Sequence, residues 1–144
     1  MSEKNLSSIS DSEWEVMRIV WTLGETNTKQ ILNELQAKKD WTDSTIKTLI
    51  RRLVQKGWLN AKQDGRRYIY TATVNQTEMM YNEAKTLLNR MCDMHKGDVI
   101  LKLLEDSPVS KGDLIKMKKE ISQKEKEAPE MVPCNCLKTG STIC

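Results

Sequence analysis

The sequence predicts a mainly α-helical protein with one small β-hairpin, followed by a second helical region and a flexible tail that contains cysteines. Three observations support this. Apolar residues recur with helical spacing in three separate segments before residue 57, two strand-like runs flank a glycine turn, and helical spacing resumes after residue 75. A chain of 144 residues is long enough for a small domain and an appended helical element.

The first two helices have recognisable ends. The first opens at Ser10-Asp-Ser-Glu13, a capping box in which the serine hydroxyl and the glutamate carboxylate each satisfy a backbone N–H, and it ends at Gly24. The second is predicted to be capped by Thr28. Its inward residues are expected to be Ile31, Leu32 and Leu35.

A third helix is expected to begin at Thr42 or Asp43 and to stop at Gly57. Strand-like runs at 58–62 and 67–72 follow, and between them Gly65 supplies the positive φ that a tight hairpin turn requires. Three helices and then a hairpin is the element order of a winged helix-turn-helix. Residues 1–75 are therefore predicted to form a winged-helix DNA-binding domain.

The second half is predicted to contain three further helical segments. Residues 77–95 form one amphipathic segment, and shorter ones lie around 99–104 and 114–121. No large domain is available to cover their apolar faces, so residues 76–122 are predicted to be a helical dimerisation region that pairs with a second copy of the chain. Residues 123–144, charged and then interrupted by prolines, are predicted to be a linker and metal-binding tail.

Positive charge is concentrated in one segment. The net charge is only +3, but residues 44–67 contain seven lysines and arginines against one acidic residue. Residues 76–144 carry eleven basic and eleven acidic side chains. This distribution is typical of a nucleic-acid contact face. No segment reaches the apolar length of a membrane span and none resembles a signal peptide, so a cytoplasmic protein without a membrane partner is expected.

Hydroxyl and basic side chains share the outward face of the third helix. Hydroxyls and a helix N-terminus can bind phosphates or base edges, and an arginine can bind guanine through two hydrogen bonds. Seen alone, such a helix is more often a solvated surface, but the adjacent basic hairpin favours DNA binding. The predicted DNA-binding residues are Ser44, Thr45, Lys47, Thr48, Arg51, Arg52, Arg66 and Arg67.

The cysteines are candidate metal ligands. Cys134 and Cys136 lie one residue apart on a flexible segment and can bind one soft ion, whereas Cys144 is a third candidate whose role stays open. In a reducing compartment such residues favour metal chemistry over disulfides. Cys92, near His95 and two methionines, would also suit Cu(I), but a lone helical cysteine is more often a small core residue, and that interpretation is preferred.

No pattern of an enzyme is present in the sequence. There is no nucleophile–base pair or phosphate-binding glycine loop, and the single histidine leaves little for general acid–base catalysis. The prediction is therefore a protein without catalytic residues.

Three segments, Ile9–Trp21, Ser44–Gly57 and Asp64–Tyr70, resemble the BlaI/MecI (penicillinase repressor) family, and the resemblance spans nearly the whole chain. It implies a homodimeric winged-helix repressor that binds double-stranded operator DNA with inverted TACA/TGTA-type repeats and dimerises through its C-terminal helices. By position, the recognition-helix contacts correspond to Ser44, Thr45, Lys47, Thr48 and Arg51, and the wing contacts correspond to Arg66 and Arg67.

The resemblance also indicates a branch of that family. Antibiotic-responsive members are induced by proteolysis of an Asn-Phe bond, but the matching dipeptide here is Lys102-Leu103 and the chain has no phenylalanine. The Cys-x-Cys tail resembles the CopY-type copper-responsive repressors. This branch implies a zinc-loaded or metal-free form that represses, and release of DNA when Cu(I) displaces Zn(II). A copper donor protein is a further candidate partner.

The tail departs from the fuller motif of that branch, which has a second Cys-x-Cys where this chain has Ser141 and Ile143. Three arrangements are open. Cys144 reaches back as a third ligand, Cys134 and Cys136 of two subunits form a shared four-sulfur site, or the segment after Cys136 is not a ligand or not native. Two other functions also stay open: a repressor of this fold with another inducer, whether metal or protease, and a metal-storage or metal-delivery protein.

Overall fold

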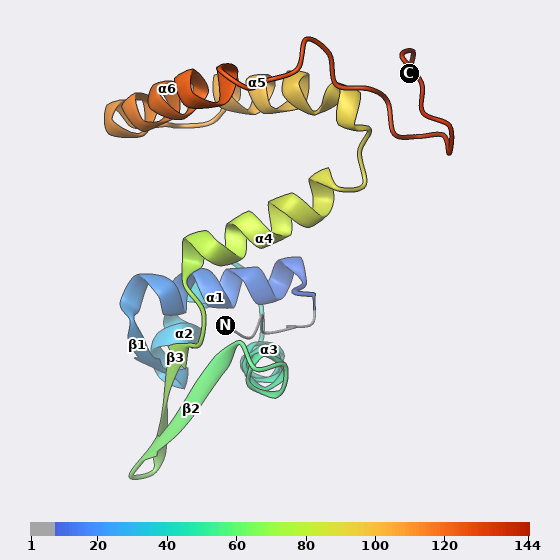
Figure 1. Ribbon diagram of the computed structural model, residues 1–144. Coiled ribbons are helices and arrows are strands. Elements are labelled where there is room, and N and C mark those ends of the chain that lie inside the picture. Colours follow the sequence, from blue (N-terminus) through green and yellow to red (C-terminus); the bar gives the residue numbers. More distant parts are fainter. Residues whose placement is uncertain (1–7) are drawn as a thin grey trace. The chain divides into compact units, whose positions relative to one another are not determined.

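The computed structural model describes residues 8–144, and the chain divides into two compact units, one ending at Met80 and one running from Tyr81 to Cys144. The first contains α1 (Asp11–Leu23), β1 (Glu25–Asn27), α2 (Thr28–Gln36), α3 (Asp43–Gln55), β2 (Leu59–Asp64) and β3 (Arg67–Ala72) (Figure 1). Helix α4 (Gln76–Leu88) crosses the boundary. The second unit continues with a 3-10 helix, η1 (Asp93–His95), and with α5 (Lys96–Asp106) and α6 (Lys111–Glu125). The predicted fold class is confirmed.

Local end signals fix the helices of the first unit. At α1, the Ser10 hydroxyl accepts a hydrogen bond from the Glu13 amide at 3.2 Å and the Glu13 carboxylate accepts one from the Ser10 amide at 3.1 Å, as predicted. Thr42 caps α3. The prediction that Thr28 caps α2 was wrong. Asn27 is the cap: its Oδ1 accepts a hydrogen bond from the Gln30 amide at 2.9 Å, and the Gln30 Oε1 accepts one from the Asn27 amide at 3.1 Å.

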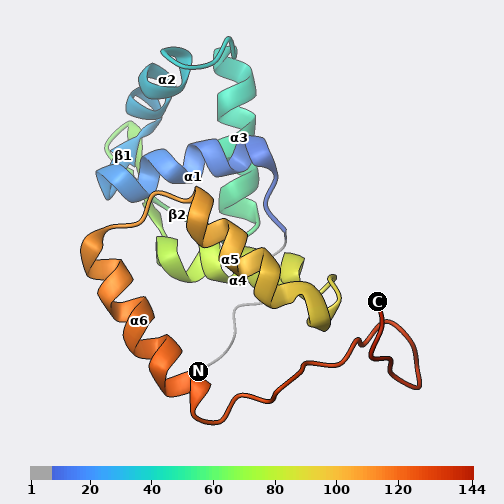
Figure 2. The same ribbon diagram turned by 90° about the horizontal axis from the view of Figure 1, so that it is seen from above.

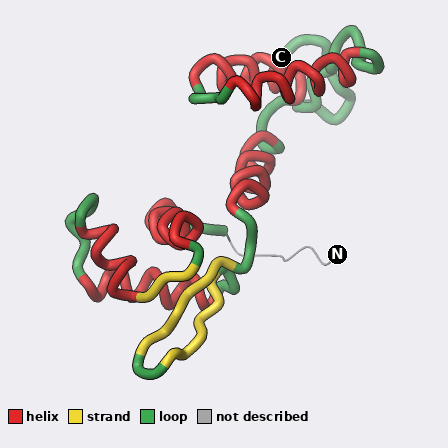
Figure 3. Tube along the Cα trace, turned by 90° about the vertical axis from the view of Figure 1, so that its left-hand side faces the viewer, coloured by secondary structure: helices red, strands yellow, loops and turns green. Residues whose placement is uncertain are grey.

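The strands form a three-stranded antiparallel sheet in the order β1-β3-β2. The β2–β3 hairpin closes where Asp64 pairs with Arg67, leaving Gly65 and Arg66 as a two-residue turn in which Gly65 has φ +64°. Strand β1 was not predicted from the sequence. Figure 3 shows the hairpin projecting away from the helices of this unit, so its turn is accessible to a ligand.

One hydrophobic core holds the first unit together, and the inward residues predicted for the second helix lie in it or against it: Ile31 and Leu35 are buried and Leu32 is partly buried. Trp14, Trp21 and Trp41 pack partly buried against it, and the Trp21 indole donates a hydrogen bond to the Val74 carbonyl at 2.9 Å. The core is thereby joined to the segment that leaves the sheet. The buried residues of the core are Ile9, Val16, Met17, Ile19, Val20, Ile31, Leu35, Ile46, Leu49, Ile50, Leu53, Trp58, Leu59, Tyr70 and Met79.

A buried ion pair fixes α3 to α1. Glu13 is 2% exposed, and its Oε1 lies 2.7 Å from the Nζ of Lys56 at the end of α3. Burial alone would raise the pKa of Glu13, but hydrogen bonds from Lys56 and Ser10 outweigh burial and lower it. Because Lys56 is engaged here, its charge is removed from the basic segment identified in the sequence.

The second unit contains helices but almost no core. The prediction of one helix over 77–95 was wrong: α4 ends at Leu88, and Cys92 is extended (φ −61°, ψ 131°). Figures 1 and 2 show α5 and α6 running in opposite directions. From Tyr81 to Cys144 the single buried residue is Cys134. Across the described residues, no helix is long and apolar enough to cross a membrane.

Candidate DNA-binding face and cysteine cluster

Helix α3 separates its apolar and polar residues onto opposite sides. Ile46, Leu49, Ile50 and Leu53 are buried in the core, whereas the predicted DNA-binding side chains of this helix point outward. Of these, Thr48 is half-buried and the others, Ser44, Thr45, Lys47, Arg51 and Arg52, are exposed. The structure therefore brings the predicted residues of α3 onto one accessible face.

The hydroxyl groups at the start of α3 are held by local hydrogen bonds. Thr42 Oγ1 lies 3.2 Å from Ser44 Oγ and 3.0 Å from Thr45 Oγ1, and Thr48 donates to the Ser44 carbonyl at 2.8 Å. These contacts place several hydroxyls beside the helix N-terminus, where backbone N–H groups and the helix dipole favour a phosphate.

The basic side chains of this face are free to bind an anion. Within residues 8–144, none of them forms an ion pair, in contrast to Lys56. Two of them, Arg66 and Arg67, lie at the hairpin turn and are exposed. The free basic residues of the segment are Lys47, Arg51, Arg52, Lys62, Arg66 and Arg67.

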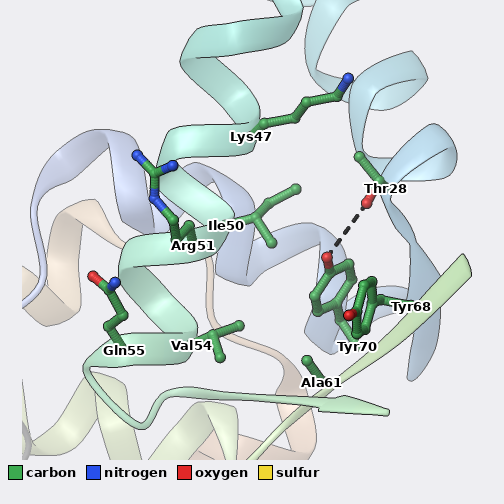
Figure 4. Close-up of a pocket in the computed structure, with 9 residues that line it drawn as sticks. All are labelled: Thr28, Lys47, Ile50, Arg51, Val54, Gln55, Ala61, Tyr68 and Tyr70. Carbon is green, nitrogen blue, oxygen red and sulfur yellow. Dashed lines mark hydrogen bonds between the residues drawn. The ribbon is translucent and has the colours of Figure 1, made fainter. Parts of the chain in front are cut away.

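A hollow between α3 and the hairpin links the two parts of this face (Figure 4). Ile50, Val54 and Ala61 contribute its apolar side, and Lys47 and Arg51 lie along its α3 side. Other lining residues are Thr28, Gln55, Tyr68 and Tyr70, and a hydrogen bond of 3.4 Å joins the hydroxyls of Thr28 and Tyr70. Packing at the base of the hollow fixes how the hairpin is oriented beside α3.

Four cysteines form a cluster in the second unit. The Sγ atoms of Cys92, Cys134, Cys136 and Cys144 all lie within 4.8 Å of one another, and those of Cys136 and Cys144 are 3.6 Å apart. The three tail cysteines predicted as ligands are thus brought together. Cys144 lies beside Cys136 of its own chain, a position that is compatible with a third ligand from the same tail.

The thiols of the cluster influence one another's ionisation. Desolvation opposes ionisation of Cys92, but hydrogen bonds from Cys144 and from the Met94 backbone, with smaller ones from the other two thiols, lower the pKa of Cys92 to about 6. The pKa of Cys144 is raised, chiefly by its hydrogen bond with Cys92. The pKa of Cys136 is raised, chiefly by Cys134. Of these three thiols, Cys92 is the one whose pKa is lowered, so its ionisation is favoured over that of Cys136 and Cys144.

The interpretation of Cys92 as a small core residue was wrong, because it is half-buried beside the tail cysteines and outside the hydrophobic core. His95 is not part of the cluster. One signal in the sequence points to Cys92: three tail thiols are one short of a four-sulfur site, and Cys92 is the remaining cysteine.

The cluster fits a thiophilic metal ion. A tetrahedral Zn(II) with bonds of about 2.3 Å to sulfur separates its ligands by about 3.8 Å, and the Cys136–Cys144 separation of 3.6 Å is close to that value. Cu(I) also prefers thiolates. The donor set thus suits either ion.

Comparisons with known proteins place these features in context. The model of the penicillinase repressor family matches residues 9–123. An uncharacterized 16.5 kDa protein from the ptsI 3' region of Latilactobacillus sakei is 46% identical over 134 residues, covering 93% of this chain and 92% of that protein. The methicillin resistance regulatory protein MecI of Staphylococcus aureus (strain N315) is 30% identical over 116 residues, covering 81% of this chain and 94% of that protein.

Among solved structures, the solution structure of the DNA-binding domain of the repressor BlaI is similar to 53% of this chain, over 93% of its own length. It shares 36% sequence identity, with a TM-score of 0.48.

Proposed function

Because the chain belongs to the penicillinase repressor family, a family of transcriptional repressors, we propose that it is a cytoplasmic, copper-responsive repressor that binds inverted-repeat operator DNA as a homodimer. In this proposal Zn(II) occupies the cysteine cluster of the DNA-bound form, and Cu(I) is the inducer. The operator is of the TACA/TGTA type that the resemblance implies. A copper donor protein would be an additional partner.

The free basic face supports the DNA-binding part. Helix α3 would enter the major groove with Ser44 and Thr45 near the phosphates and with Lys47, Thr48 and Arg51 toward the base edges. Arg52 would contact the flanking backbone. The hairpin would place Arg66 and Arg67 along the adjacent phosphates or in the minor groove. All of these basic side chains lack an internal ion-pair partner among the described residues.

The exposed apolar side chains of α5 and α6 support the homodimer. Ile115 is 61% exposed, and a second copy of the same surface would remove it from water. Two DNA-binding units joined in this way match an inverted repeat. The exposed apolar residues of the two helices are Ile100, Leu101, Leu103, Leu114, Ile115, Met117 and Ile121.

The cysteine cluster is the single observation on which the copper response rests. Four thiols converge within 4.8 Å in a chain whose other unit presents a free basic face. Zinc prefers four tetrahedral ligands, whereas Cu(I) is soft and needs fewer thiolates. Exchange of the two ions would therefore alter how many cysteines are held, without disturbing the core of the DNA-binding unit.

Operator binding tests the proposal. Fluorescence anisotropy of a labelled inverted-repeat duplex would be measured with the full-length protein, with Zn(II) and with Cu(I). The expected result is release by Cu(I) and retention by Zn(II). Release by zinc instead would identify a repressor with another inducer. Binding without sequence preference would indicate a metal-storage or metal-delivery protein.

The variant Cys134→Ser/Cys136→Ser separates sensing from DNA binding. It should bind the operator but no longer release it with Cu(I). Normal release by this variant would contradict the sensing role of the tail.

A further inference from the structure

We infer that Cys92 completes a metal site within one chain, and that it is the ligand that Zn(II) uses and Cu(I) does not need. This inference rests on the proposed function and specifies its regulation. Cys92 lies between α4 and η1, far from the tail in sequence, yet its Sγ is within 4.8 Å of the three tail sulfurs. A single chain therefore supplies all four ligands of a tetrahedral site, and no sulfur from a second subunit is required.

A hydrogen bond outside the sulfur cluster holds the tail against the segment that carries Cys92. The Asp93 amide, adjacent to Cys92, donates to the Asn135 side chain at 3.0 Å. Asn135 lies between Cys134 and Cys136 in sequence, so this contact positions these two cysteines next to Cys92. Cys136 also donates its amide to the Cys134 sulfur at 3.4 Å. The position of the tail beside Cys92 is thus supported by a contact that does not involve the four sulfurs.

The residues that replace the second Cys-x-Cys pair build the turn that returns Cys144. Cys134 and Ser141 exchange backbone hydrogen bonds of 2.8 and 3.3 Å, and Gly140 has φ +74° in the turn between them. The Ser141 hydroxyl then accepts from the Ile143 amide at 3.1 Å. Cys144 is directed back to Cys136 by this turn. Ser141 thereby has a structural role in place of a ligand role.

A metal ion held by Cys92 and the tail would join the two ends of the chain segment that contains α5 and α6. This segment runs from Cys92 to Cys134, the one buried residue between Tyr81 and Cys144. Metal binding contributes directly to folding where the ligands come from distant segments. Occupancy of the site therefore stabilises the ends of the segment that carries the proposed dimer surface.

The position of Cys92 explains how Zn(II) and Cu(I) would produce two different states of the tail. Cys134, Cys136 and Cys144 lie on one short segment and can satisfy an ion that needs two or three thiolates, as Cu(I) does. A four-coordinate ion also needs Cys92. Replacing Zn(II) by Cu(I) then frees Cys92, and the tail is no longer fastened to the turn after α4.

Alkylation of the full-length protein tests this directly. N-ethylmaleimide would be applied to the metal-free, Zn(II)-loaded and Cu(I)-loaded protein, and modified cysteines mapped by mass spectrometry. The expected result is protection of all four cysteines by Zn(II), and alkylation of Cys92 alone with Cu(I). A reactive Cys92 in the zinc form, or a protected Cys92 in both forms, would overturn the inference.

The Cys92→Ser variant gives an independent measurement, with Met91→Ala as the matched control because Met91 is adjacent and lies outside the cluster. Zn(II) affinity should fall at least about tenfold in Cys92→Ser, as expected for loss of a ligand, while Cu(I) affinity is retained. Unchanged zinc affinity, with copper response still lost in Cys134→Ser/Cys136→Ser, would refute the inference and leave the proposed function standing. A copper response that survives in every cysteine variant would refute the proposed function.

Discussion

The two units of this chain are stabilised in opposite ways. The unit that ends at Met80 encloses a core in which Val16 and Ile31 are inaccessible to solvent, whereas from Tyr81 to Cys144 the single buried residue is a cysteine. A unit with its own core can hold DNA-contacting residues in a fixed arrangement. A unit without one depends on what binds to it. DNA binding and its proposed regulation therefore lie in separate parts of the chain.

Matched isoleucine substitutions test whether the two units are stabilised separately. Ile31 is 0% exposed, so Ile31→Ala should lower the free energy of unfolding of the first unit by about 2–5 kcal/mol. Ile115 is 61% exposed, so Ile115→Ala should leave that free energy unchanged and weaken association instead. Tryptophan fluorescence during denaturation reports the first unit alone, since all four tryptophans lie in it. Sedimentation would report association.

An equal loss of stability in both variants would show that the two units unfold as one.

Removal of the metal is expected to destabilise the second unit and to leave the first unit unchanged. At free Zn(II) a thousandfold above its dissociation constant, binding contributes about 4 kcal/mol, and we expect this to act on the second unit. Chelation should therefore increase amide hydrogen exchange in α5 and α6. The tryptophan-monitored midpoint of the first unit should not move. Loss of exchange protection in α1 or α3 on chelation would contradict the separation.

Substitution of an exposed arginine tests operator binding without changing the hydrophobic core of the first unit. Arg51→Ala should weaken binding to a matched operator by about 1–3 kcal/mol, because an exposed side chain proposed to contact the base edges is lost, and it should leave thermal stability unchanged. Lys124→Ala, a charge-matched change near the end of α6, is the control. If Arg51→Ala and Arg66→Ala both bind normally, the predicted face is not the DNA-binding surface.

The Glu13–Lys56 pair gives the smallest expected effect. Because the pKa of Glu13 is lowered in the folded protein, its contribution is present above the unfolded pKa of about 4.3. That contribution is lost as pH falls through the lower folded pKa. Glu13→Gln should cost about 1–2 kcal/mol at neutral pH and flatten the acid dependence, as measured by denaturant unfolding between neutral and acidic pH. If the pH dependence of the free energy of unfolding is unchanged in this variant, it arises from groups other than Glu13.

The elements of the first unit that the sequence predicts correctly are those set by local chemistry. The capping box at Ser10, the start of the third helix at Thr42 or Asp43 and the turn at Gly65 are each set by residues close in sequence. Strand β1 escaped prediction because its three residues have no strand pattern of their own. It exists through pairing with β3, where Thr26 lies opposite Tyr70.

The parts of the cysteine site that were missed depend on contacts between distant residues. The break after Leu88 and the extended Cys92 accompany the hydrogen bond from Asp93 to Asn135, which is 42 residues away. Helical periodicity alone continues through this segment, so it favours a single helix. The Cys-x-Cys pair was recognisable because its two members are neighbours in sequence, whereas Cys92 joins them only in the folded chain.

The ion pair of Lys56 has a consequence for ionic strength. Seven basic residues lie in the segment 44–67, but Lys56 is held by Glu13, so six can displace counterions from DNA. If all six of one chain contact phosphates, the logarithm of operator affinity should fall with the logarithm of salt concentration with a slope of about −5 per chain. Glu13 of α1, which is not one of the predicted DNA-binding residues, thereby limits how strongly salt can weaken the complex.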